Sequence, residues 1–208
     1  MCVLVLVVFS GLVGCADPSD TEEAFTGSTS VIDEVDSRFI GETDFRDWAT
    51  KNSSLAEAEE FLKVELRVPA DTLGHELLQI YTLETYPNGE PVDRLNQAAI
   101  FDYGDYTVGF IVCGSAESAQ AWVDGQVNDL AVETGLGRRT KVNGHSAVVR
   151  TRGTVPMKTD ASGKVLRPGI TYGSNVVSWA RGEVYVSVSS TAVSGDDLLQ
   201  VARSIDSD

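Results

Sequence analysis

Hydrophobic residues recur with two periods from residue 51 onward. Period two, in which every second residue is apolar, predicts β-strands over residues 62–68 and 183–190. Apolar runs that end at turn residues predict further strands over residues 77–86, 95–103, 106–113 and 175–180. A period near 3.6 predicts helices over residues 55–61 and 116–134, and a third that ends at Ile205. Strands that follow one another through short turns favour antiparallel pairing. The pattern therefore predicts an α+β fold, in which helices pack on an antiparallel sheet in a single domain.

Turn and cap residues predict where these elements end. The predicted hairpin turns are Gly104-Asp105, Asn143-Gly144 and Arg181-Gly182. Ser54 and Ser194 each precede an acidic residue by three positions, which is the capping-box pattern at a helix start. The hairpin over 95–113 is apolar on both sides, which indicates central strands covered on both faces. Residues 156–169 show neither period and predict a looser segment.

The predicted helix 116–134 contains Gly125 in its interior. A glycine there costs about 1 kcal/mol relative to alanine. Helical spacing places Trp122 on the apolar stripe of the same segment. We therefore expect this helix to be held by docking Trp122 on the sheet rather than by its own propensity.

Residues 1–14 have the features of an export signal. Val3–Val13 is an apolar run too short to span about 30 Å of hydrocarbon but typical of a signal-peptide core. The run closes on Leu12-Val13-Gly14-Cys15, which resembles the lipobox of bacterial lipoproteins. The resemblance implies a lipid on Cys15 and anchoring at the extracytoplasmic face of the cell membrane. No Lys or Arg precedes Val3, so either the start lies upstream or the export signal is weak.

Residues 15–50 differ in composition from the rest of the chain. Between residues 16 and 50 there are ten Asp or Glu against two Arg, with few large apolar groups before residue 39. Such a stretch cannot bury enough surface to offset its ordering entropy, so we expect an acidic tether. Phe39, Phe45 and Trp48 interrupt the pattern and predict a short helix that rests on the domain. The predicted organisation is a signal peptide over 1–14, a tether over 15–50 and an α+β extracytoplasmic domain over 51–208.

The C-terminal half carries a second resemblance. The segments are Asn143-Gly144-His145-Ser146-Ala147, Val177-Ser178-Trp179, Val184-Tyr185 and Ala202-Arg203-Ser204-Ile205. In this order they resemble an extracytoplasmic domain family of unknown function, which occurs in lipoproteins and in anti-sigma factors. The helix over 116–134 is similar instead to that of small lipoproteins with the photosystem extrinsic protein fold. Neither resemblance implies catalytic residues, and a shared fold does not establish function.

Charge narrows the functional classes. The chain has 16 Lys or Arg against 31 Asp or Glu, a net charge of −15 that argues against nucleic-acid binding. Residues 138–167 run against this trend, with eight Lys or Arg and one Asp. A solvated hairpin face explains such a cluster, as does an anion-binding face for headgroups, a wall polymer or an acidic protein segment. The candidate binding residues are Arg138, Arg139, Lys141, Arg150 and Arg152.

The expected geometry of this basic cluster follows from strand alternation. Arg150 and Arg152 are two residues apart, so we expect both on one exposed strand face. Ala147 and Val149 then point inward and hold the hairpin in register.

Candidate catalytic chemistry is sparse. His75 and His145 are the two histidines, and neither has a Cys or carboxylate at metal-ligand spacing. Ser146 follows His145 on a strand, where neighbouring residues point to opposite faces. Cys113, the cysteine left after Cys2 and Cys15, is expected to be a buried apolar side chain.

These observations favour a membrane-anchored extracytoplasmic binding or sensing module rather than an enzyme. No cofactor or metal is expected, and the expected partners are the membrane, through the N-terminal lipid, and an anionic surface or protein. Two alternatives stay open. The first is a carrier of an apolar or lipid ligand in a cavity between sheet and helices, and the second is an uncharacterised enzyme.

Overall fold

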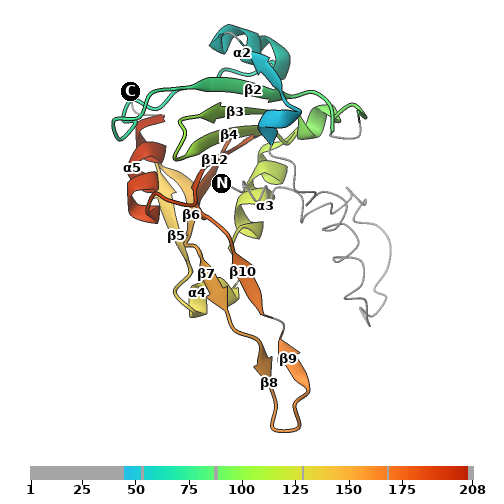
Figure 1. Cartoon of the computed structure of the whole chain (residues 1–208), viewed down its shortest axis with the longest axis vertical. Helices are drawn as coiled ribbons and strands as arrows, with labels where there is room; N and C mark the ends of the chain where they lie inside the picture. The colour runs from blue at the N-terminus through green and yellow to red at the C-terminus, as the bar shows by residue number, and fades with distance from the viewer. Residues whose placement is uncertain (1–44, 53, 87–88, 128, 168, 206–208) are drawn as a thin grey trace. The chain divides into compact units, whose positions relative to one another are not determined.

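An eight-stranded antiparallel sheet forms the centre of the domain (Figure 1). A computed structural model describes residues 45–52, 54–86, 89–127, 129–167 and 169–205. In spatial order the strands are β1 (Thr50–Asn52), β2 (Gln79–Leu83), β3 (Ala98–Asp102), β4 (Thr107–Val112), β12 (Val184–Ser190), β11 (Asn175–Arg181), β6 (His145–Arg150) and β5 (Gly137–Val142). The α+β fold predicted from the hydrophobic pattern is confirmed.

One face of the sheet, here called the core face, carries the main hydrophobic core. Large side chains from the central strands, among them Phe101, Phe110 and Trp179, are fully buried there. Helices α2 (Leu55–Leu62) and α5 (Gly195–Ile205) cover this face with their apolar stripes. Both capping serines predicted from the sequence are confirmed, because the backbone N–H three residues on donates to the hydroxyl of Ser54 and of Ser194.

The opposite face, here called the α3 face, is more polar. Helix α3 (Ala116–Gly125) crosses β6, β11 and β12 on this side, where Trp122 packs on Tyr185 with 5.8 Å between ring centroids. The strand register places Thr107, Ser178, Ser187 and Ser189 on the same side as Tyr185. Docking through Trp122 therefore agrees with the expectation from the sequence.

The helix predicted over 116–134 is broken in two. Helix α3 ends at Gly125, and a separate short helix, α4 (Asp129–Glu133), follows. A Cβ on Gly137 would lie 2.7 Å from Val127 Cγ1 and 3.0 Å from Ala131 Cβ. The chain after Gly125 thus bends to pack tightly on the first residue of β5, which an unbroken helix would not do.

The strand predicted over 62–68 is wrong. Leu62 ends α2, and Lys63 takes a left-handed conformation with φ of 58°. The edge of β2 is paired instead with β1, from before the helix. Residues 64–78 run without strand pairing, and the alternation does not match burial there, because Leu66 is buried whereas Val68 is exposed.

The predicted hairpins are present. Asn143 and Gly144 both have positive φ, 46° and 86°, as a two-residue turn between β5 and β6 requires. The β3–β4 hairpin lies inside the sheet, as predicted. The last hairpin is shifted by one residue, because Arg181 pairs with Val184 and leaves Gly182-Glu183 as the turn.

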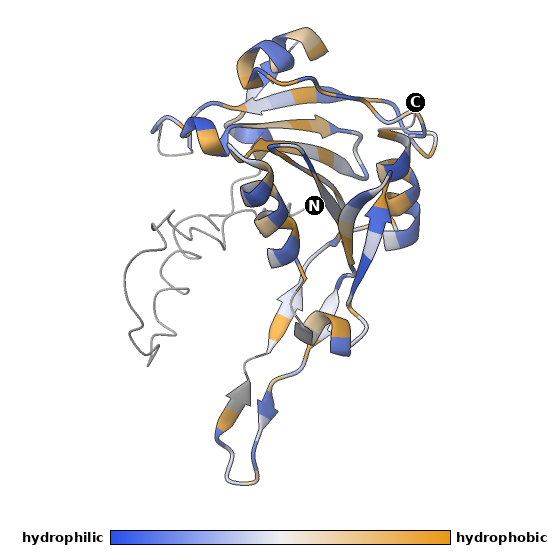
Figure 2. Ribbon diagram, turned by 180° about the vertical axis from the view of Figure 1, so that it is seen from behind, coloured by the Kyte–Doolittle hydropathy of each residue, from blue (hydrophilic) through white to orange (hydrophobic). Residues whose placement is uncertain are grey.

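Residues 153–172 form an arm of two small ladders instead of a loose segment (Figure 1). Strand β7 (Gly153–Val155) pairs with β10 (Ile170–Tyr172), and β8 (Lys158–Thr159) pairs with β9 (Val165–Arg167). The Asp160 carboxylate accepts hydrogen bonds from the backbone N–H groups of Ser162 and Lys164 and shapes the tip. Figure 2 shows hydrophobic and hydrophilic residues mixed along this arm, where Met157 and Val165 are exposed.

The described residues also contain two short 3-10 turns, η2 (Phe45–Asp47) and η3 (Arg94–Asn96). In place of the short helix predicted before residue 51, η2 rests on the domain through an edge contact between Phe45 and Tyr81. The predicted export signal, Cys15 and the predicted tether up to residue 44 lie outside the described residues. Within the residues that are described, no helix combines the length and apolar character needed to cross a membrane.

Candidate functional site

A polar groove lies where three loops meet at one end of the sheet. Its volume is about 480 Å³. Its lining residues are Val64, Glu65, Arg67, Asn143, His145, Arg181 and Val184. These residues come from the segment after α2, the β5–β6 turn and the β11–β12 turn. The fold thus gathers residues that are more than 100 positions apart in the chain.

Hydrogen bonds hold the walls of the groove together. The Arg181 guanidinium donates to the backbone carbonyl of Glu65, which ties the β11–β12 turn to the segment after α2. The Asn143 amide donates to the carbonyl of Arg203 at 2.8 Å, which ties the β5–β6 turn to α5. Because both links join separate elements, the groove is preformed rather than assembled by a mobile loop.

The groove carries more positive than negative charge. Arg67 and Arg181 keep their charge at any physiological pH. Glu65 opposes them, and its carboxylate accepts from Arg67 Nε at 3.3 Å. His145 adds an imidazole that donates or accepts a hydrogen bond. This lining suits a polar ligand with negative charge.

The basic residues predicted as one binding cluster are dispersed. Arg138 and Arg139 are neighbours on β5 and point to opposite faces, where Arg138 pairs with Asp196 and Arg139 with Asp124. Lys141 is exposed on the same strand. Arg152 lies beyond the end of β6 and donates to the carbonyl of Thr191. The structure therefore does not bring these side chains together into one surface.

The expected exposed pair of Arg150 and Arg152 is wrong. Strand β6 ends at Arg150, whose side chain is buried, with a residue exposure of 2%. It lies between α3 and the base of the arm, where Nη1 donates to Gln126 Oε1 at 3.1 Å and the guanidinium sits 4.9 Å from the centre of the Tyr172 ring. The inward orientation of Ala147 and Val149 is confirmed.

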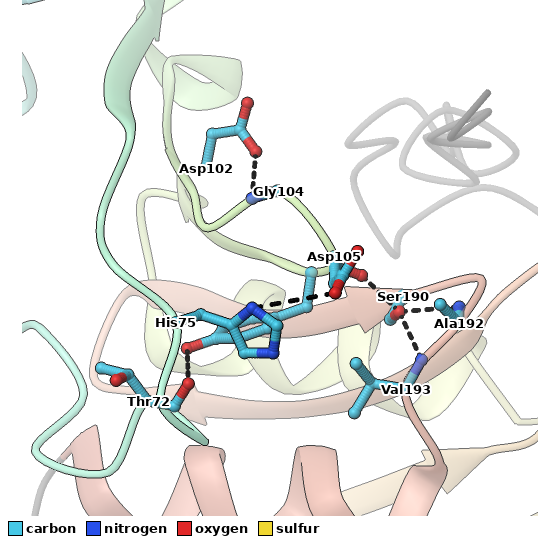
Figure 3. Close-up of polar contacts among 9 residues, drawn as sticks. Thr72, His75, Asp102, Gly104, Asp105, Ser190, Ala192 and Val193 are labelled. Carbon is cyan, nitrogen blue, oxygen red and sulfur yellow. Dashed lines mark hydrogen bonds and ion pairs between the residues drawn. The ribbon is translucent and has the colours of Figure 1, made fainter.

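A second polar corner surrounds His75 (Figure 3). His75 Nδ1 lies 3.8 Å from a carboxylate oxygen of Asp105, and its ring meets Tyr106 edge-on. The Ser190 hydroxyl donates to the backbone carbonyl of Asp105 at 2.6 Å and accepts from the N–H groups of Ala192 and Val193. Ser190 is thus engaged by the backbone and is not a hydroxyl activated by His75.

The described residues also offer no activated cysteine nucleophile and no metal site. Burial raises the pKa of the Cys113 thiol to about 11, outweighing the hydrogen bond from the Tyr185 backbone, so little thiolate exists at neutral pH. This agrees with the apolar role expected from the sequence. Among the residues that the structure describes, no group of three metal-ligating side chains gathers.

The positions of the aromatic residues of the sheet show whether they fill the core or line an apolar pocket, as a carrier of an apolar ligand would require. Trp179 is fully buried on the core face, and Tyr185 is buried beneath α3. Burial raises the pKa of Tyr185 to about 12. Both side chains fill space instead of lining an opening, and the groove described above is polar.

Comparisons with known proteins leave the family open. A scan against protein-family models finds no match, and a search of curated proteins finds none either. The lipoprotein lipobox and the resemblance of the C-terminal half stay predictions from the sequence.

Proposed function

We propose that this protein is an extracytoplasmic ligand-binding lipoprotein, anchored through Cys15, that takes a small anionic ligand in the polar groove. The observation that carries the proposal is the groove itself, in which Arg67, Arg181 and His145 converge from three separate loops. A volume near 480 Å³ falls within the usual range of small-molecule sites.

Electrostatics favours an anion over an apolar ligand. Arginine side chains match carboxylate and phosphate groups in shape and charge. In a chain with a net charge of −15, a local positive groove also distinguishes this surface from its surroundings. The alternative of an apolar carrier has less support, because the aromatic residues that would line its cavity are packed in the core.

Imidazole NMR spectra of the full chain in neutral detergent provide the test. The chain has two histidines, and they report on different places. His145 lines the groove at the Val184 end of β12, whereas His75 lies by Asp105, near the Ser190 end. Titration with inorganic phosphate or succinate should shift the His145 signals and leave those of His75 unchanged, with sodium chloride of equal ionic strength as reference.

Arg67→Gln should weaken this binding by about threefold to tenfold, as expected for the loss of one partly exposed charge-assisted hydrogen bond. The matched control is Arg94→Gln, which removes the same charge from an exposed position in η3. Equal affinities in the two variants, or equal shifts at both histidines, would show that the groove is not the binding site.

A further inference from the structure

Among the described residues, Arg150 is a buried cation without an acidic partner. The bond from Nη1 to Gln126 is the hydrogen bond that its guanidinium makes within the described residues. Its Nε is fully enclosed and has no acceptor there. In that same part of the chain, no carboxylate forms an ion pair with it. The Nε and Nη2 groups form the edge through which an arginine side chain makes a bidentate hydrogen bond to a carboxylate.

This arrangement is costly unless something compensates it. A buried charge without a counter-ion loses its hydration and gains little in return. Gln126 and the Tyr172 ring face supply part of that compensation. Burial lowers the pKa of Arg150, against smaller opposing effects of Tyr185 and Tyr172, yet a guanidinium stays protonated at neutral pH. The site therefore keeps its positive charge and favours an anion.

Further buried polar groups lie on the same face. Arg150 pairs with Val176 across β6 and β11, so its side chain shares the α3 face with Ser178, two residues further along β11. Burial raises the pKa of Tyr185, and hydrogen bonding from the buried Ser178 hydroxyl partly offsets that rise, so Ser178 has a polar neighbour in Tyr185. Buried polar atoms are almost always satisfied, so the Nε of Arg150, which has no acceptor among the described residues, indicates a missing polar group on this face.

We propose that Arg150 anchors an interior oxyanion site beneath α3, in which a carboxylate or phosphate group accepts hydrogen bonds from Nε and Nη2. The site is separate from the polar groove, which lies at the other end of β6, and it does not rest on the proposed function. Gln126 follows the last residue of α3, and Tyr172 closes the base of the arm. Because Nε is enclosed and these two side chains contact the guanidinium, an anion reaches Nε only once they move aside.

The direct test observes the Nε–H signal of Arg150 by NMR in the full chain. The signal is assigned by its loss in Arg150→Lys, which keeps the charge but removes the bidentate edge. Acetate and inorganic phosphate are the probes, and sodium chloride of equal ionic strength is the reference. At least one oxyanion should move the Arg150 proton downfield, and the one that does identifies the preferred group. Groove variants such as Arg67→Gln should leave this shift unchanged.

A second test supplies the anion within the chain. Gln126→Glu places a carboxylate where the present amide oxygen lies 3.1 Å from Nη1. The melting temperature should rise, and the oxyanion effect at Arg150 should shrink. Gln120→Glu adds the same charge within α3 without contacting Arg150, loses the Gln120–Asp124 hydrogen bond, and should give no such gain. If neither oxyanion moves the Arg150 signal, or if Gln126→Glu is no more stable than the parent, the cation needs no further partner and the proposal is wrong.

Discussion

Asp102 and Arg150 are both buried on the α3 face of the sheet, and their surroundings differ sharply. Both carboxylate oxygens of Asp102 accept hydrogen bonds from the Arg46 guanidinium, at 2.6 and 2.9 Å, and one also accepts from the Gly104 N–H. Desolvation raises the pKa of Asp102, but the bonds to Arg46 and Gly104 outweigh it and the net pKa is lowered. Asp102 is thus a satisfied buried charge that links η2 to the β3–β4 turn.

Replacement of Asp102 by Asn should lower the free energy of unfolding by about 1–3 kcal/mol at neutral pH, because Arg46 loses its anionic partner. The folded-state pKa lies below the unfolded value of about 3.9, so the ionised carboxylate contributes stability above that value and loses it as the pH falls through the folded pKa. Urea unfolding at several pH values measures both effects.

The difference between the parent and Asp102→Asn should therefore shrink in acid. Asp93→Asn, at an exposed position without a cap hydrogen bond, serves as the control and should cost little at any pH. A difference that stays constant from neutral to acidic pH would show that Asp102 does not act through its charge.

At the scale of the residue, strand alternation alone predicts the wrong environment for Arg150, which is buried and not exposed. The sequence indicates that Ala147 and Val149 point inward, and they do. The assignment of the other face to solvent fails because α3 covers it as well. Val148 shares the parity of Arg150 and is itself apolar and buried, so the residue type at 148 already signalled a strand covered on both sides.

At the scale of elements, hairpins and caps are predictable because their signals are local. Asn143-Gly144 and Ser194 act within a few residues of their own position. The break after Gly125 depends on packing against Gly137, which is distant in the sequence. The strand that pairs with β2 is β1, and not the alternating run over 62–68. The polar groove could not be predicted from the sequence for the same reason. Arg67 and Arg181 are far apart in the chain, and only the fold brings them together.

The outer ladder of the arm should be dispensable for folding. Residues 158, 159, 164 and 165 are exposed, and the buried side chains of the arm, Val155 and Tyr172, belong to the inner ladder. A variant in which Asn-Gly replaces residues 156–169 would close β7 and β10 directly, since Val155 pairs with Ile170.

This variant should melt within a few degrees of the parent, because it removes little buried apolar surface. Circular dichroism during heating gives the comparison. Tyr172→Ala is the contrasting change, because it removes a buried ring stacked on Arg150 and should lower the melting temperature markedly. A large loss of stability in the shortened arm would mean that its tip packs on the domain.

At the scale of the whole molecule, charge is unevenly distributed. Residues 16–50 carry ten acids against two bases, and the segment 138–167 carries eight bases against one acid. The structure spreads those bases over both faces of β5, the interior and the arm. Basic residues that are close together in the sequence therefore do not form one basic patch on the surface. The proposed anchoring and the proposed recognition then belong to separate regions, the N-terminal segment for the membrane and the folded domain for the ligand.

The proposed anchor predicts the behaviour of the whole chain in a bacterial host. Cys15→Ala should accumulate in an unprocessed form or leave the membrane fraction, because the residue that would carry the lipid is gone. Cell fractionation, with mass spectrometry of the mature N-terminus, measures both outcomes and should find an acylated Cys15 in the parent. Cys2→Ser is the matched control, since it alters a cysteine that the cleaved signal would remove. If Cys15→Ala matures and sediments with membranes as the parent does, the chain is held there by something other than a lipid on Cys15.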